Sequence, residues 1–296
     1  MEHLKDREVA IIERKANKIR ISLIESLIEA GSGHTAGPLG MADVFATLYF
    51  SVLRYDPKNP LADDRDRVIL SNGHICPVLY ATMAHAGFFP TKELKTLRQF
   101  GSRLQGHPHR EFLPGIETSS GPLGSGLSQA VGMALADRID RPQSPVFFYC
   151  FMSDGELNCG QVWESVMLAG RDQPYNLIAV IDRNGIQIDG FTRDIMPLEP
   201  LQEKFESFNW HVINTDGHNV QEIHSAFGEA QSAHRPTVII AHTVPGKGVP
   251  QFERDYRWHG TPPGKGPEDI VTKDKQGICA LKQLRNLKGT IVSECE

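Results

Sequence analysis

The sequence predicts an α/β protein in which a parallel sheet of five or six strands carries helices on both faces. Residues 145–152 and 177–182 are short apolar runs without alternation, which is typical of strands buried on both faces of a parallel sheet. Between them, Val162, Val166 and Ala169 recur at helical spacing. A strand, a helix and a second strand in this order form a βαβ unit, whose two strands lie parallel.

The alternation of helical and strand-like segments continues along the chain. Helical periodicity predicts helices over residues 5–30, 41–53, 75–98 (interrupted at 87–90), 127–139, 157–170, 198–208 and 220–234. Apolar runs predict strands over residues 65–71, 145–152, 177–182, 210–214 and 237–243. We expect Gly170 to end the helix of the central unit, and residues 216–219 to form a turn and N-cap.

The composition predicts one soluble domain over residues 1–296, with residues 265–296 as a C-terminal extension of unassigned role. The 296 residues are 40% hydrophobic, enough for a full core, and no linker or repeat divides them. A net charge of −5 with mixed signs argues against a nucleic-acid partner. The first ten residues lack a signal peptide's apolar core, and apolar runs of about eight residues are too short to span a membrane. Five cysteines without paired spacing favour a reduced, cytoplasmic protein.

Polar residues follow both strands of the central unit. Asp154 and Asn184 lie 30 positions apart (184 − 154), and ligands of open α/β sheets bind where strands end. We expect Asp154 to supply a carboxylate, Asn184 an amide oxygen and Ile186 a backbone carbonyl to Mg²⁺, or to Ca²⁺ or Mn²⁺ in its place, carrying a diphosphate. Gly155 would let the backbone approach the phosphate, and a helix opening at Glu156 would offer it free N–H groups. Each dipeptide alone is an ordinary turn signal, and the spacing of the pair favours a site.

This unit resembles a known enzyme family. The stretch S-D-G-E at 153–156, followed by N-G-I at 184–186, is similar to the thiamine diphosphate motif in the form that transketolases use. The resemblance runs from about residue 10 to 262 and includes further motifs in the family's order. It implies the thiamine diphosphate-binding fold, and thiamine diphosphate held through a divalent ion at Asp154, Asn184 and Ile186.

Four histidines lie in stretches that are similar to transketolase motifs. His34 lies in the Gly-rich stretch 31–40, His74 ends L-S-N-G-H, His107 lies in G-H-P, and His259 lies in W-H-G. The resemblance implies that His34 faces the sugar, that His74 and His259 contact the diphosphate and the substrate, and that His107 belongs to the active site. From the residues alone, an exposed loop histidine or a structural histidine at a strand end is the more frequent explanation.

The Gly-rich stretch G-P-L-G-S-G at 121–126 leads into the helix at 127–139. Such an entry either cradles an anion or lets another segment pack closely, and the residues alone do not decide between these. In transketolases the similar Gly-Pro-Leu backbone lines the cofactor. This implies cofactor contacts for Gly121, Pro122 and Leu123.

The sequence also departs from the family's motifs. The departures are Ser153 for the first Gly of G-D-G, Thr35 and Ala36 for a Pro-Gly pair, His109 for a Glu, and Cys159 for another Glu. In transketolases that second Glu belongs to a chain of carboxylates linking two active sites, and Glu164 of the same chain is present here. Because a Cys mostly keeps its proton near neutral pH, we hypothesise weaker communication between paired sites.

The resemblance covers only the first domain of a transketolase, and the domain that binds the aminopyrimidine ring lies outside it. It therefore implies the N-terminal subunit of a split enzyme that needs a C-terminal transketolase subunit, in an α2β2 assembly. The enzyme would transfer a two-carbon ketol unit from a ketose phosphate to an aldose or aldose phosphate. His34, His74, His107 and His259 would be its catalytic residues.

Two alternatives remain open from the sequence. One is another thiamine diphosphate enzyme, such as a 2-oxoacid dehydrogenase E1 subunit or a deoxyxylulose-phosphate synthase. The other is a non-catalytic, cofactor-binding regulatory subunit. The donor and acceptor sugars are equally open between a pentose-phosphate role and a specialised sugar or sulfosugar pathway.

Overall fold

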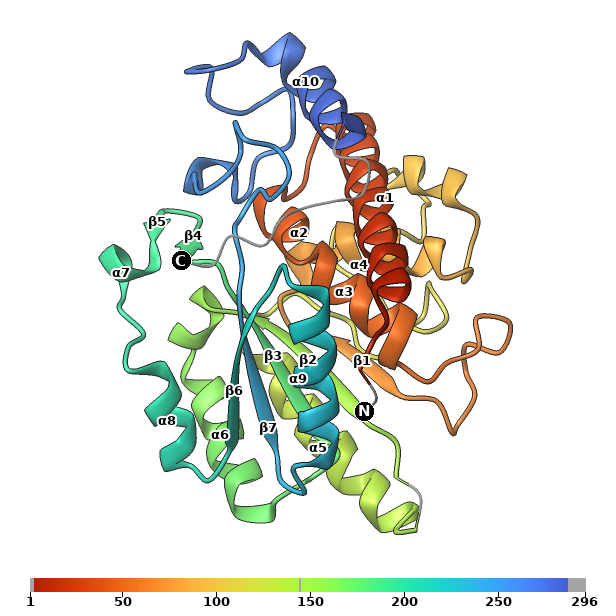
Figure 1. Ribbon diagram of the computed structural model, residues 1–296, viewed down its shortest axis with the longest axis vertical. Helices are drawn as coiled ribbons and strands as arrows, with labels where there is room; N and C mark the ends of the chain where they lie inside the picture. Colours follow the sequence, from red (N-terminus) through yellow and green to blue (C-terminus); the bar gives the residue numbers. More distant parts are fainter. Residues whose placement is uncertain (1–2, 144, 287–296) are drawn as a thin grey trace.

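The computed structural model describes residues 3–143 and 145–286 of the chain. Its centre is a five-stranded, all-parallel sheet with the strand order β1-β2-β3-β7-β6 (Figure 1). The strands are β1 (Arg67–Leu70), β2 (Phe148–Ser153), β3 (Leu177–Arg183), β6 (His211–Asp216) and β7 (Thr237–His242). The predicted parallel sheet of five or six strands is therefore confirmed, with five.

The sheet separates two apolar clusters because successive side chains of a strand point to opposite faces. On β2, for example, Tyr149 and Phe151 belong to one cluster, and Phe148, Cys150 and Met152 belong to the other. One cluster is covered by α1 (Asp6–Ala30), α3 (Ala42–Thr47), α4 (Cys76–His85) and α9 (Val220–Ser232). The other is covered by α5 (Ser125–Asp140), α6 (Gly160–Asp172) and α8 (Leu201–Ser207). Helices on both faces are therefore confirmed.

Shorter elements connect these layers. They are α2 (Ala36–Gly40), the π-helix η1 (Leu48–Val52), the 3₁₀-helices η2 (Gly73–Ile75), η3 (Thr91–Thr96), η4 (Gly155–Asn158) and η5 (Tyr256–Trp258), α7 (Thr192–Ile195), and the antiparallel pair β4 (Ile186–Gln187) and β5 (Gly190–Phe191). The predicted N-cap before α9 is confirmed, since the side chain of Asn219 accepts hydrogen bonds from the N–H groups of Gln221 and Glu222.

Two predictions about the central helix are wrong. The helix does not open at Glu156, because residues 155–158 form the 3₁₀-helix η4 and α6 begins at Gly160. Gly170 does not end it either, since α6 continues to Asp172 and Gln173 takes the left-handed conformation at its end. Gly170 is needed for packing instead: a Cβ there would overlap the carbonyl oxygen of Phe208.

The segment that follows residue 265 contains α10 (Lys273–Asn286), which lies along α1 (Figure 1). Asn17 Nδ2 donates to the carbonyl oxygen of Leu284 at 3.0 Å, and Arg285 forms an ion pair with Glu25 at 3.0 Å. The expected extension at 265–296 is therefore packed onto the core as far as Asn286, and residues 287–296 lie outside the described part.

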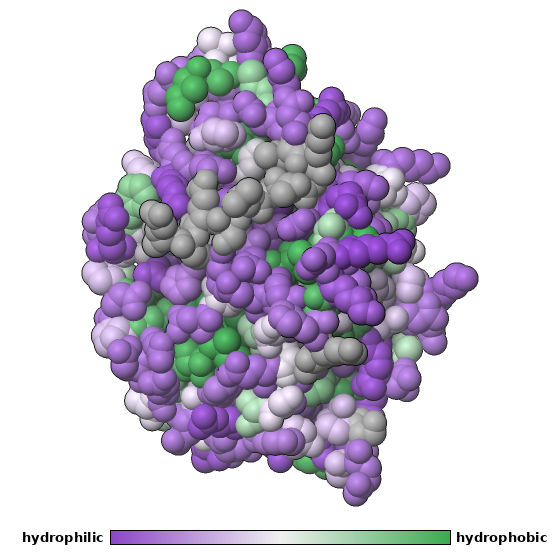
Figure 2. Space-filling model, viewed as in Figure 1, coloured by the Kyte–Doolittle hydropathy of each residue, from purple (hydrophilic) through white to green (hydrophobic). Residues whose placement is uncertain are grey.

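Hydrophobic residues on the face seen in Figure 2 form separate small groups among hydrophilic ones. Within the described residues, no helix is both long enough and apolar enough to span a bilayer.

Candidate active site

The parallel register of β2 and β3 brings Asp154 and the turn after β3 to the same edge of the sheet. Ser153 is the register partner of Asp182, so Asp154 and Asn184 follow neighbouring strand ends as predicted. Asp154 is fully buried. Its Oδ1 accepts a hydrogen bond from the N–H of Gly155 at 2.8 Å, and its Oδ2 accepts one from the N–H of Gly185 at 2.7 Å.

Asn184 is oriented by hydrogen bonds on both sides of its amide. Its Oδ1 accepts from the N–H of Ile186 at 3.0 Å, and its Nδ2 donates to Asp182 Oδ2 at 2.8 Å. Asp182 is itself buried, and burial raises its pKa to about 7 in spite of the hydrogen bond from Thr243. The carboxyl group of Asp182 thus fixes the amide of Asn184 with its oxygen toward the Ile186 side.

Three of the predicted histidines form a compact triangle. The ring centroids lie 4.8 Å apart for His34 and His74, 5.2 Å apart for His74 and His259, and 5.4 Å apart for His34 and His259. They come from three distant parts of the chain: the loop after α1, the 3₁₀-helix η2 and the end of η5. His107 lies beside them on an exposed loop, close to Gly73.

These histidines surround a cavity of about 270 Å³ at the carboxyl edge of the sheet. The predicted site residues that line it are His34, His74, His107, Gly121, Leu123, Gly155, Glu156, Ile186 and His259. Three predicted residues do not line it: Pro122, Asp154 and Asn184. Asn184 and Ile186 instead line a second cavity of about 610 Å³ on the other side of the turn, so Ile186 borders both.

Several polar atoms around the smaller cavity are buried and have no hydrogen-bond partner among the described residues. They are His34 Nδ1, His259 Nδ1 and Gln187 Nε2; both polar atoms of Asn72, two positions before His74, are buried without a partner as well. Leaving such groups unpaired costs about 1–3 kcal/mol each, so buried polar atoms are nearly always satisfied. Their gathering beside one cavity is what a site for a polar ligand requires.

Burial holds the histidines in the neutral form. It lowers the pKa of His34 to about 3, helped by the nearby His259, Arg98 and His107. It also lowers the pKa of His259 to about 4, and the pKa of His74 far below its ordinary value. A neutral imidazole offers one donor and one acceptor, which suits it to hydrogen bonds with hydroxyl groups.

The structure supports the close-packing role for part of the Gly-rich stretch 121–126. At Gly124, which has a φ of 87°, a Cβ would come within 2.8 Å of the Cβ of Cys159, and at Gly126 it would overlap Ser71. These two glycines allow close packing. A Cβ at Gly121 would meet no atom within 4 Å, and this residue faces the cavity.

Comparison with known proteins identifies the family. The family model described as transketolase, thiamine diphosphate binding domain, matches residues 11–283. The chain belongs to the transketolase family. It is 44% identical over 239 residues to the 6-deoxy-6-sulfo-D-fructose transketolase subunit of Clostridium sp. (strain MSTE9), an alignment that covers 80% of this chain and 86% of that protein. It is 36% identical over 283 residues to an apulose-4-phosphate transketolase subunit of Phocaeicola vulgatus, covering 95% of this chain and 100% of that protein.

A solved transketolase confirms the thiamine diphosphate-binding fold. The crystal structure of an R525L mutant of transketolase from Pichia stipitis superimposes with a TM-score of 0.83 at 33% sequence identity. The match covers 94% of this chain and 41% of that one, so the chain spans less than half of that transketolase.

The donor set fits a divalent ion that a diphosphate helps to hold. Asp154 and Asn184 offer one carboxylate and one amide oxygen, and Mg²⁺ sites commonly combine one or two carboxylates with phosphate oxygens and water. Within residues 3–143 and 145–286, no group of three or more His, Cys, Asp or Glu side chains is arranged to hold a metal.

The sequence did not single out four residues that lie in or next to this candidate site. Asn72 lies within the L-S-N-G-H stretch, whose similarity to the family could have flagged it. Gln187 and Ile188 line the smaller cavity directly after Ile186. Arg183 contacts Asp154, and no pattern in the sequence indicated that contact.

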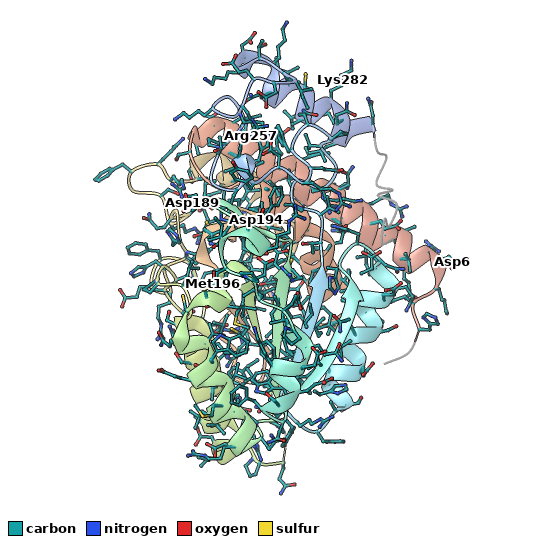
Figure 3. All side chains as sticks on the ribbon, turned by 90° about the vertical axis from the view of Figure 1, so that its left-hand side faces the viewer. Asp6, Asp189, Asp194, Met196, Arg257 and Lys282 are labelled. Carbon is teal, nitrogen blue, oxygen red and sulfur yellow. The ribbon has the colours of Figure 1, made fainter. Side chains whose placement is uncertain are left out.

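The turn that carries Asn184 continues into an exposed segment. Figure 3 shows Asp189, Asp194 and Met196 on the outer side of this segment, with Arg257 nearby. The segment is anchored where the Phe191 ring meets Tyr256 edge-on at 5.6 Å. This contact joins β5 to the 3₁₀-helix η5, which ends just before His259.

Proposed function

We propose that this chain is the N-terminal, thiamine diphosphate-binding subunit of a two-subunit transketolase. The enzyme transfers a two-carbon ketol unit from a ketose phosphate to an aldose or aldose phosphate, and it is active only with a C-terminal transketolase subunit. One observation carries the proposal most directly. Unpaired buried polar atoms and three mutually contacting histidines surround the cavity beside Asp154 and Asn184.

The residues that hold the cofactor are taken from the motifs that this chain shares with transketolases. Asp154, Asn184 and the carbonyl of Ile186 hold Mg²⁺, with Ca²⁺ or Mn²⁺ able to replace it. The cofactor contacts are assigned to His74, Gly121, Pro122, Leu123, Asp154, Gly155, Glu156, Asn184, Ile186 and His259. When bound, thiamine diphosphate supplies the electron sink for cleavage of the C2–C3 bond of the ketose.

The four histidines act on the substrate as neutral imidazoles. His34 and His259 each have a buried Nδ1 atom without a partner among the described residues, which leaves it free for a substrate hydroxyl. His74 completes the triangle, and His107 lines the same cavity. Near neutral pH such rings stay uncharged, so they act on the substrate as hydrogen-bond donors and acceptors for its hydroxyl groups.

The assembly is proposed from relatives that are subunits by name. Because the transketolase subunit of Phocaeicola vulgatus matches over its full length, we infer a separate C-terminal subunit and an α2β2 complex in the cytoplasm. Residues 1–296 then form one diphosphate-binding domain. A sulfosugar or an apulose phosphate is supported as a substrate only by the names of the two relatives, so both belong in the assay beside pentose phosphates.

The test is ketol transfer by the native complex. The tagged chain is purified from its own cells, and ketol transfer is assayed with the chain alone and with the subunit that copurifies. The proposal is supported if ketol transfer requires both this chain and the copurifying subunit. Transfer should also be lost in Asp154→Asn and kept in the exposed control Asp189→Asn. Turnover of pyruvate instead would point to another thiamine enzyme. Tight cofactor binding without transfer beside any partner would point to a regulatory subunit.

A further inference from the structure

We propose that Arg183 sets the affinity of the Asp154 site for a divalent ion by competing, as a positive charge, for the carboxylate that the ion needs. This inference rests on the proposed function, because it concerns the ion at the same site. The residue is a positioning residue: it acts on Asp154, and through Asp154 on the ion.

The contact lies at the centre of the site. Arg183 Nη1 donates to Asp154 Oδ2 at 2.8 Å, and the same oxygen accepts from the N–H of Gly185. The side chain of Arg183 is 17% exposed and that of Asp154 is fully buried, so water screens this pair weakly. The guanidinium thus already gives Asp154 one close positive charge.

The carboxylate has little free capacity left. An ionised carboxylate offers about four lone-pair positions, two on each oxygen. On Asp154, Gly185 and Arg183 take both positions of Oδ2, and Gly155 takes one of Oδ1. An ion at Asp154 must therefore take the remaining position on Oδ1 beside the guanidinium or displace Arg183 from Oδ2. Both routes weaken ion binding.

Arg183 has a second partner that can receive it. Its Nη2 donates to Glu199 Oε1 at 2.8 Å, and Glu199 is fixed because its Oε2 accepts from the N–H of Leu201 at 2.8 Å. Arg183, Thr192 and Glu199 all line the 610 Å³ cavity, so the guanidinium has room on the side away from Asp154. Arg183 contacts Glu199 and Asp154 at the same time, so the negative charge of Glu199 partly offsets the guanidinium charge beside Asp154 and remains its partner when the ion displaces it.

The experiment measures Mn²⁺ binding at saturating thiamine diphosphate by calorimetry, using the full chain in the assembly in which it purifies. Arg183→Gln removes the charge and keeps a hydrogen-bonding side chain, so Mn²⁺ should bind about tenfold tighter than in the wild type. Arg183→Lys keeps the charge and should stay within about threefold of the wild type. The matched control is Arg193→Gln, because Arg193 lines the same cavity but faces Asp194 and the Phe191 ring.

Glu199→Gln gives a second test on an exposed residue whose change leaves the core intact. It should weaken Mn²⁺ binding in the wild-type background and have no effect in the Arg183→Gln background, because the coupling runs through Arg183. Unchanged or weaker binding in Arg183→Gln overturns the inference while leaving the proposed function standing. Absence of Mn²⁺ binding in the wild type and in every variant overturns both.

Discussion

The carboxylate of Glu156 accepts a hydrogen bond from the backbone N–H of Gly124 at 2.6 Å, although the two residues lie 32 positions apart in the sequence. Its Oε1 also accepts from the hydroxyl of Ser71, and its Oε2 accepts from the N–H of Ser153 at 3.3 Å. Glu156 is fully buried, so this one side chain joins the end of β1, the end of β2 and the Gly-rich stretch 121–126. It therefore shapes the wall of the cavity that the histidines surround.

Glu156→Gln tests this role. The variant places an NH₂ group among three donors, which leaves at least one of them unpaired, and the free energy of unfolding should fall by about 1–3 kcal/mol. Urea unfolding of the purified chain measures the change. The exposed control Glu203→Gln should shift stability by less than about 0.5 kcal/mol. An equally small effect of Glu156→Gln would contradict the bridging role.

Gly170 and Gly132 form a second matched pair. Both are helical, but a Cβ at Gly170 would overlap the Phe208 carbonyl, whereas a Cβ at Gly132 would meet nothing within 4 Å. Gly170→Ala should therefore destabilise the chain by about 1–3 kcal/mol, and Gly132→Ala should stabilise it by about 0.5–1 kcal/mol. The melting temperatures of the two variants should move in opposite directions. A shift in the same direction would refute the packing assigned to Gly170.

A buried ion pair predicts how stability depends on pH. Burial raises the pKa of Asp43, but the Arg20 guanidinium, at 2.6 Å, and the hydrogen bond with His218 outweigh burial and lower the pKa to about 2. Because the pKa in the folded state lies below the ordinary value, the stabilisation is present above about pH 4 and is lost as the pH falls toward 2. Asp43→Asn should cost about 3 kcal/mol or more at pH 7, since it leaves Arg20 unpaired.

The specific test of the Asp43–Arg20 ion pair is how the destabilisation by Asp43→Asn changes with pH. Urea titrations of the wild type and of Asp43→Asn should give a difference in unfolding free energy that shrinks between pH 4 and pH 2. A constant difference across this range would exclude an ionised Asp43 as the cause.

The burial of the histidine triangle predicts that its rings do not titrate near neutral pH. Because burial lowers the pKa of His34 to about 3 and that of His259 to about 4, neither ring should take up a proton between pH 5 and pH 8. NMR of the ring protons checks this, with each signal assigned from its loss in His34→Asn or His259→Asn. In urea both rings should titrate near their ordinary pKa of about 6.5. A signal that titrates near pH 6.5 in the folded chain would show that the triangle is open to water.

Cys159→Glu tests the departure in the central motif. The side chain of Cys159 is half-buried at the start of α6, and Glu164 on the same helix is exposed. If the missing carboxylate weakens communication between paired sites, the variant should bind thiamine diphosphate with higher cooperativity in the native complex. Glu164→Gln in the same background should abolish the gain. Identical binding curves for Cys159→Glu and the wild type would remove the hypothesis.

The sequence predicted the features that depend on local pattern. Apolar runs located all five strands of the parallel sheet, and the 30-residue spacing of Asp154 and Asn184 correctly placed both residues at neighbouring strand ends. Features that depend on distant contacts could not be read in this way. Gly170 has the pattern of a helix terminator, but its neighbour Phe208 is 38 positions away (208 − 170). The contact of Arg183 with Asp154 and the burial of Asn72 likewise exist only once separate strands and loops have come together.

The central claim is that Asp154 and Asn184 hold thiamine diphosphate through a divalent ion. Calorimetric titration of thiamine diphosphate in excess Mg²⁺ tests it, using the purified assembly with wild-type chain, Asp154→Asn and the exposed control Asp189→Asn. The account predicts one cofactor per chain for the wild type and for Asp189→Asn, and binding that is roughly 100-fold weaker or worse for Asp154→Asn, since the ion loses its carboxylate. Equal affinity in Asp154→Asn, or no binding by the wild type, would contradict it.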